Sequence, residues 1–79
     1  MFKEYSFEDK EILKKVGIRI KSLRKQKNLS QFDLATEAEI PKNQIGRIER
    51  FEINTSLVTL NRIAKALKID LEELFNLSD

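Results

Sequence analysis

The 79-residue chain contains no cysteine and no histidine. Zinc fingers, disulfide frameworks, thiol or imidazole catalysis and histidine-based metal sites all require one of these residues, so the sequence excludes each of them. One proline and two glycines give little of the turn chemistry that β-hairpins need. Acidic residues interrupt the first ten positions of the chain, so this segment contains no apolar run as long as a signal peptide or membrane span. We therefore expect a cytoplasmic protein with no membrane partner, no metal and no cofactor.

The small size of the chain limits what it can enclose. A domain of this length buries only roughly 60–65% of the surface that its unfolded chain exposes, which leaves a thin core and no room for a deep substrate cavity. Hydrophobic residues make up 41% of the chain and charged residues 35%, as in ordinary globular domains, so the chain should fold. Binding by the surface is favoured over catalysis, and we expect neither an enzyme nor a small-molecule site.

Apolar residues recur at helical spacing in five segments. Three segments open with a capping box, in which an N-cap oxygen and an acid three residues later satisfy the first turn. The predicted helices cover about 7–25, two turns after position 30, about 42–50, 57–67 after a cap at 55 or 56, and a brief stretch after position 70. The prediction is an all-α, compact five-helix bundle in a single domain, 1–79, with residues 1–11 as an N-terminal extension. The capping boxes are Ser6 with Asp9, Ser30 with Asp33, and Asp70 with Glu73.

The net charge of +2 is unevenly distributed along the chain. Residues 14–50 contain ten Lys and Arg against four Asp and Glu, and so carry +6, while the remainder carries −4. Binding to DNA phosphates requires such a basic region, because each neutralised phosphate releases condensed counterions. A solvated, lysine-rich helix face explains the same charges, so charge alone does not decide between the two.

The spacing of the middle helices adds information. A two-turn helix after Ser30, a connection of about three residues and the helix over 42–50 form a helix-turn-helix, whose second helix can enter a major groove. The domain that contains it is expected at 12–77. Ile45 and Ile48 mark the buried edge of the second helix. Its other side presents long, donor-rich side chains suited to reading base edges, although a routine bundle surface is the alternative. These side chains are Lys42, Asn43, Gln44 and Arg47.

Four spaced motifs follow one another in order over about 16–75. With them, the chain closely resembles the lambda-repressor-like Cro/Xre helix-turn-helix family, and in particular short phage Cro-type repressors and the small controller proteins of restriction-modification operons. The resemblance implies a five-helix DNA-binding domain that represses or activates transcription at a two-fold symmetric operator. The motifs are Gly17-x-Arg19-Ile20-x-x-Leu23-Arg24, Leu29-Ser30-Gln31-x-x-Leu34-Ala35, Ile45-x-x-Ile48-Glu49 and Leu60-x-x-Ile63-Ala64-x-Ala66-Leu67.

The resemblance also implies roles for single residues. Lys42, Asn43 and Arg47 fall where members of the family read bases, with Gln44 beside them. Arg47 suits a guanine and Asn43 an adenine. Phosphate contacts position the protein without specifying sequence. The phosphate candidates are Gln31, which would also buttress the second helix, and Lys27, Arg50 and Asn54.

Arg24 and Glu49 match the pair that ties the first helix to the end of the third in this family, a structural salt bridge. The chain departs from the family at three positions. Glu39 stands where glycine is usual in the turn and is expected to need left-handed backbone. Pro41 replaces the usual serine or threonine cap, so that helix lacks a side-chain cap. Phe51 replaces the glycine that ends the helix, with its ring either packed on the following loop or exposed for a partner.

One recognition helix reads only a few base pairs, so we expect a homodimer on a palindromic operator with its two helices roughly 34–36 Å apart. The last apolar side chains are the expected dimer contacts, because the core cannot cover them all. The alternative is an N-terminal aromatic arm. The last apolar residues are Leu74, Phe75 and Leu77, and the arm would comprise Phe2, Tyr5 and Phe7.

A second class of function is compatible with the same fold. A protein-interaction module, such as an antitoxin or an adaptor, can keep the helices and use another surface, because fold does not dictate function. Catalysis is remote, since Ser30 is expected as a helix cap and the Glu72-Glu73 pair as solvated surface. The donors on the 42–50 helix favour a DNA-binding regulator associated with the nucleoid.

Overall fold

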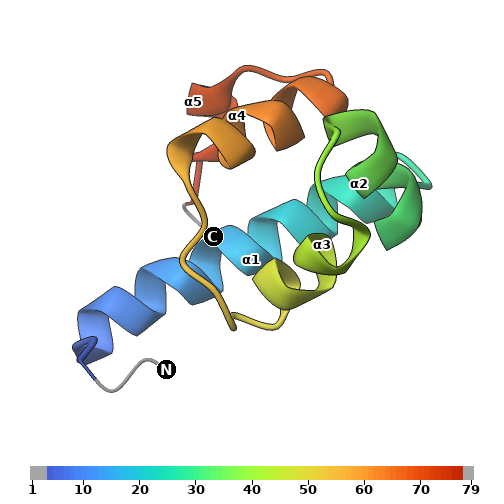
Figure 1. Cartoon of the computed structure of the whole chain (residues 1–79). Helices are drawn as coiled ribbons and strands as arrows, with labels where there is room; N and C mark the ends of the chain where they lie inside the picture. Colours follow the sequence, from blue (N-terminus) through green and yellow to red (C-terminus); the bar gives the residue numbers. More distant parts are fainter. Residues whose placement is uncertain (1–3, 78–79) are drawn as a thin grey trace.

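The computed structural model describes residues 4–77 as five α-helices without a strand. α1 runs the length of the molecule, and its first turns project beyond the other helices (Figure 1). α3 packs on α1 and α2, α2 also packs on α4, and α5 contacts α4 and α1. The predicted all-α, five-helix fold is confirmed. The helices are α1 (Phe7–Gln26), α2 (Gln31–Ala38), α3 (Lys42–Glu49), α4 (Leu57–Ala66) and α5 (Leu71–Leu74).

The described part of the N-terminal extension, residues 4–11, is continuous with the rest of the fold. The boundary expected between 1–11 and 12–77 falls inside α1, which continues without interruption from Phe7. The Phe7 side chain is 76% exposed on the projecting turns. None of the described helices is both long and apolar enough to cross a membrane.

Capping boxes close the first turns of α1 and α2, as the sequence predicts. In each, the N–H of the acid donates to the serine hydroxyl, at 3.0 Å for Ser6 and 2.9 Å for Ser30, and the serine N–H donates back to the carboxylate. The prediction of a third capping box, between Asp70 and Glu73, is wrong. Asp70 is the N-cap of α5, but in this four-residue helix the Glu73 N–H donates to the Asp70 backbone carbonyl at 3.0 Å, which takes the place of a side-chain cap.

Apolar side chains from all five helices meet in a single core. Leu60 is half-buried, packs against this core and also borders a groove. The burial of the other expected residues explains why the short helices are stable, because an amphipathic face packed on neighbours stabilises a helix more than its own propensity does. These buried residues are Leu34, Ala35, Ile45, Ile48, Ile63 and Leu67.

α1 and α3 approach each other closely at Gly17. A Cβ atom at this position would lie 2.5 Å from the Ile48 carbonyl oxygen and 2.9 Å from Cδ1 of Phe51. Phe51 follows α3 in the left-handed conformation, with φ 64°. Its ring packs over Gly17 on α1 and is half-buried. The absent side chain at Gly17 makes room for the bulky residue that ends α3.

Candidate nucleic-acid interface

α2 and α3 are joined by a short turn that contains no glycine. Glu39 adopts the expected left-handed backbone, with φ 59° and ψ 46°, at a cost of roughly 1–2 kcal/mol for a residue other than glycine. The Glu39 N–H donates to the Thr36 carbonyl at 3.2 Å and the Ile40 N–H to the Ala35 carbonyl at 3.1 Å, which satisfies the end of α2. Pro41 is the N-cap of α3, and within the described chain no side chain caps this end.

A buried ion pair fixes the end of α3 to α1. The Arg24 Nε and Nη2 atoms donate to the Glu49 carboxylate at 2.7 and 3.0 Å, and both residues are more than nine-tenths buried. The Arg24 Nη1 atom also donates to the Leu29 carbonyl at 2.8 Å. The hydrogen bond to Glu49 raises the pKa of Arg24 above its ordinary value. Arg24 and Glu49 thus form the ion pair that the family resemblance implies.

The side chain of Gln31, at the start of α2, completes this network. Its Nε2 atom donates to Oε1 of Glu49 at 3.0 Å, which ties α2 to the end of α3. A Cβ atom at Gly46 would lie 3.2 Å from Oε1 of Gln31 and 3.0 Å from Nη1 of Arg50. Two of the four phosphate candidates, Gln31 and Arg50, therefore come together over Gly46.

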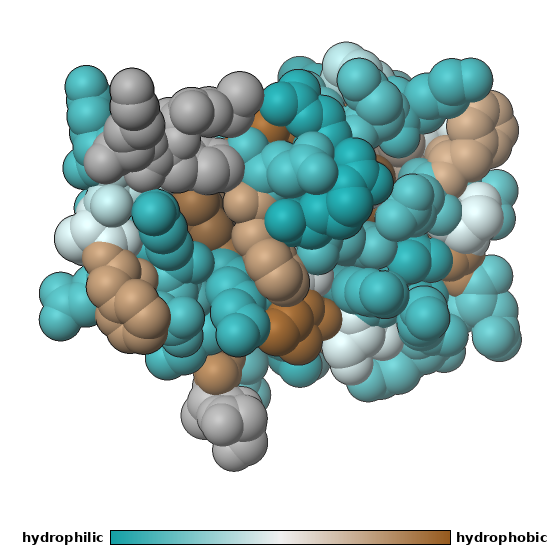
Figure 2. All heavy atoms as spheres, turned by 90° about the horizontal axis from the view of Figure 1, so that it is seen from below, coloured by the Kyte–Doolittle hydropathy of each residue, from teal (hydrophilic) through white to brown (hydrophobic). Residues whose placement is uncertain are grey.

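The outer face of α3 carries the four side chains expected to read bases. Lys42 and Asn43 are exposed, and Gln44 and Arg47 are half-buried. The underside of the molecule in Figure 1 is mostly hydrophilic, with apolar spots broken up by polar side chains (Figure 2). α3 is thus polar outside while Ile45 and Ile48 fill the core beneath it.

Phe32 of α2 lies next to this face, and its sequence pattern does not mark it as a site residue. It is 58% exposed, and the Lys42 ammonium lies 5.7 Å from the centre of its ring, a cation–π contact. Position 32 lies three residues before the buried Ala35, so helical spacing alone does not separate Phe32 from the buried face of α2.

Glu52 is a second residue that sequence reasoning missed. Its carboxylate accepts from Nε of Arg50 at 2.8 Å and from Nη2 at 3.3 Å, and the Arg47 Nε lies 3.7 Å away. The hydrogen bond from Arg50 holds the pKa of the Glu52 carboxyl below its ordinary value. One acid therefore contacts both arginines at the end of α3.

The remaining phosphate candidates lie in different places. The Asn54 Nδ2 atom donates to the Tyr5 hydroxyl at 2.9 Å, so the connection between α3 and α4 is tied to the residues before α1. Lys27 follows α1 and lines a shallow hollow with Glu37 and Lys68, beside α2 and α4. The structure does not place Lys27 with the residues of α3.

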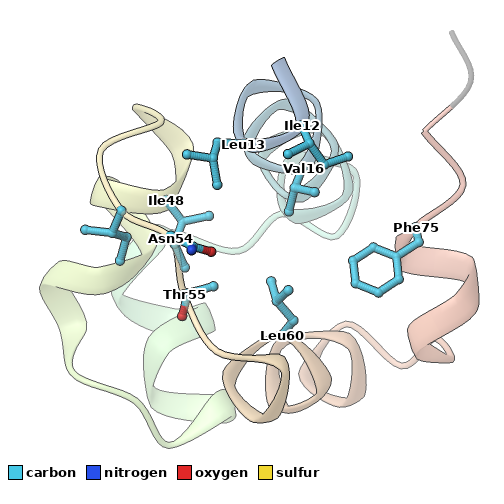
Figure 3. A pocket seen from close by; sticks show the side chains of 9 residues that line it. Ile12, Leu13, Val16, Ile48, Asn54, Thr55, Leu60 and Phe75 are labelled. Atoms are coloured by element: carbon cyan, nitrogen blue, oxygen red, sulfur yellow. The ribbon is translucent and has the colours of Figure 1, made fainter. Parts of the chain in front are cut away.

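The expected dimer contacts need a correction at Leu74. This side chain is completely buried in the core of its own chain, so it is not available to a partner. Phe75 is 38% exposed and Leu77 is half-buried. Phe75 borders an apolar groove of about 220 Å³ and faces α1 residues such as Ile12 across it, with Leu60 of α4 below (Figure 3). Of the proposed arm, Phe2 lies outside the described residues.

Known proteins share this sequence pattern and this arrangement. The family HTH_3, Helix-turn-helix, matches residues 20–74. The immunity repressor protein of Bacillus phage phi105 is 41% identical over 59 residues, which cover 75% of this chain and 41% of that protein. The control protein C.MunI of Mycoplasma sp is 39% identical over 61 residues, which cover 76% of this chain and 82% of that protein. The chain therefore matches less than half the length of the phage repressor.

A solved structure shows the same fold. The restriction-modification controller protein C.AhdI from Aeromonas hydrophila superposes with a TM-score of 0.80 at 40% sequence identity, over 82% of this chain and 98% of that chain. The likeness thus extends over almost the whole of the controller protein and over most of this chain. The chain belongs to the helix-turn-helix family HTH_3, a family of DNA-binding transcriptional regulators.

Proposed function

We propose that the chain is a sequence-specific regulator of transcription that inserts α3 into the major groove of double-stranded DNA. The observation that carries the proposal is the two-sided character of α3: donors cover its outer face, and its inner edge is locked to α1 by the buried pair of Arg24 and Glu49. A major groove about 12 Å wide admits one helix with its side chains. A recognition helix on a rigid scaffold keeps its donors at fixed positions relative to the bases.

The proposed DNA contacts divide into base-reading side chains on α3 and phosphate-binding side chains from other segments. Arg47 contacts a guanine through two N–H groups and Asn43 pairs with an adenine, each worth roughly 1–3 kcal/mol of discrimination. Lys42 and Gln44 read the edges of adjacent bases, and the contact with Phe32 orients Lys42. Phosphate contacts set the register of the helix in the groove. These come from Gln31, Lys27, Arg50 and Asn54.

The chain binds its palindromic operator as a homodimer, since one such helix contacts only a few base pairs. Apolar surface remains for a second copy at Phe75 and Leu77, next to the groove of Figure 3. Leu57 and Val58 at the start of α4, each 63% exposed, are further candidates. Binding to nucleoid DNA places the regulator in the cytoplasm.

Selection of bound sites from a random DNA pool tests this proposal. The expected product is a palindrome whose half-sites are centred about 10 base pairs apart, because two recognition helices lie one DNA turn apart. A mobility shift on random duplex at rising salt provides the companion measurement, and affinity should fall steeply as counterions return to the phosphates. Indifference to duplex DNA at low salt would overturn the proposal and favour an antitoxin or adaptor.

A further inference from the structure

Glu52 occupies an unusual position for an acid, next to the two arginines of the proposed DNA-binding face. Most of the charge in residues 14–50 is positive, and Glu52 follows that segment directly. Its two carboxylate oxygens take both N–H groups that Arg50 directs at them and also lie near Arg47. The three side chains are partly exposed, with 45% of the Glu52 side chain open to solvent.

The backbone at the end of α3 holds Glu52 in place. The Phe51 N–H donates to the Ile48 carbonyl at 3.0 Å, and the Glu52 N–H donates to the Arg47 carbonyl at 2.8 Å. These two bonds and the left-handed Phe51 form a Schellman motif, which here contains phenylalanine in place of glycine. Because the Phe51 ring is packed against Gly17, the motif is anchored to α1. Glu52 is therefore directed at the arginines by the fold and not by a flexible loop.

We propose that Glu52 is a specificity-determining residue that restrains Arg47 and Arg50 and lowers the affinity of the protein for DNA of the wrong sequence. This inference rests on the proposed function. Non-specific binding depends on contacts between cations and phosphates. An acid that already neutralises Arg50 weakens those contacts on any duplex.

The distances indicate which arginine is released first. Arg50 is held by two hydrogen bonds, whereas the Arg47 Nε lies 3.7 Å from the carboxylate, beyond hydrogen-bond distance. Arg47 can therefore turn to a guanine before Arg50 leaves Glu52 for a phosphate. On a correct site, the contact between Arg47 and the base offsets the loss of affinity that Glu52 causes. On an incorrect site no such contact forms, and the acid lowers affinity without compensation.

Glu52→Gln tests the proposal because it removes the charge and preserves the shape. Binding should be measured to the duplex recovered by selection and to a scrambled duplex of the same composition. We expect affinity for the scrambled duplex to rise about fivefold, with a salt slope steeper by about one, and affinity for the selected duplex to rise less. Glu37→Gln is the matched control, since it makes the same charge change on an exposed residue of α2 that faces α4. It should raise both affinities slightly and equally.

Equal changes on both duplexes for Glu52→Gln, or a loss of affinity for the selected duplex alone, would overturn the inference and leave the proposed function standing. Failure of the unaltered protein to bind any duplex at low salt would instead overturn the proposed function, and the inference with it. A measurement without DNA tests the ion pair itself. The Arg50 Nε–H resonance should shift in Glu52→Gln and not in Glu37→Gln. An unchanged resonance in Glu52→Gln would contradict the proposed restraint of Arg50.

Discussion

Two arginine–glutamate clusters lie three residues apart at the end of α3, and they differ in burial. Glu49 is 7% exposed and is paired with Arg24 inside the protein. Glu52 pairs with Arg50 and contacts Arg47 at the surface. Removing one partner of a buried pair leaves a charge without compensation, whereas water readily replaces a partner at the surface. The first cluster is therefore part of the scaffold, whereas the arginines of the second cluster can leave Glu52 and bind DNA.

Glu49→Ala should give the largest effect. It removes the acceptor of two Arg24 hydrogen bonds and one from Gln31, and it leaves the Arg24 charge buried. We expect a loss of about 3 kcal/mol in the free energy of unfolding, measured by urea denaturation. Glu52→Ala is the comparison and should leave the urea midpoint nearly unchanged. Equal destabilisation by both substitutions would break the distinction between the clusters.

The two glycines differ in whether backbone or movable side chains lie against them. Gly17→Ala places a Cβ 2.5 Å from the Ile48 carbonyl oxygen, so α1 and α3 must separate, and we expect a loss of about 1–3 kcal/mol. Gly46→Ala meets only the movable ends of the Arg50 and Gln31 side chains, at 3.0 and 3.2 Å. It should leave thermal stability nearly unchanged and alter DNA binding. A stable Gly17→Ala protein would contradict the close packing inferred at this site.

Arg47→Ala and Lys27→Ala separate base reading from phosphate contact. The first should relax preference at one base position by roughly 1–3 kcal/mol and leave folding intact. The second should weaken binding to all sequences alike and reduce the salt slope by about one. Titrations against single-base variants of the selected duplex provide the measurement. If both substitutions shifted every duplex equally, the assignment of Arg47 as a reader would be wrong.

The smallest effect concerns pH and the exposed cap of α2. Hydrogen bonds from the Ser30 backbone and hydroxyl lower the pKa of the Asp33 carboxyl below its ordinary 3.8. A lowered folded-state pKa contributes stability that is fully present above the unfolded value and is lost as the pH falls through the folded value. The urea midpoint should therefore decline below about pH 4, and less steeply in Asp33→Asn. Identical pH profiles for the two proteins would contradict the cap's contribution.

Local spacing was enough to predict most of the fold. The capping boxes at Ser6 and Ser30 and the apolar stripes depend on residues within a few positions of each other, and a single sequence displays such patterns directly. The capping-box pattern at Asp70 failed, because the Glu73 N–H donates to the Asp70 backbone carbonyl in this four-residue helix. Leu74 was expected at a dimer contact because its burial depends on α1 and α4, which its local pattern does not reveal.

The candidate site was predictable only in part. The order of the motifs placed the donors on α3 and the pair of Arg24 with Glu49, because these follow from family spacing. The basic segment over residues 14–50 ends at Arg50, so Glu52 lies outside it and was not predicted as part of the site. The position of Glu52 depends on the left-handed turn at Phe51 and on the packing of the Phe51 ring against Gly17. The local sequence pattern does not reveal that packing.

Arginine side-chain NMR during a titration with the selected duplex tests the central claim most directly. Each Nε–H group reports on its own partner, so one spectrum follows both clusters at once. The account predicts that Arg47 shifts strongly on binding, that Arg50 shifts less, and that Arg24 keeps its resonance because its bonds to Glu49 stay buried. A shift of Arg24 with unmoved resonances of Arg47 and Arg50 would contradict it.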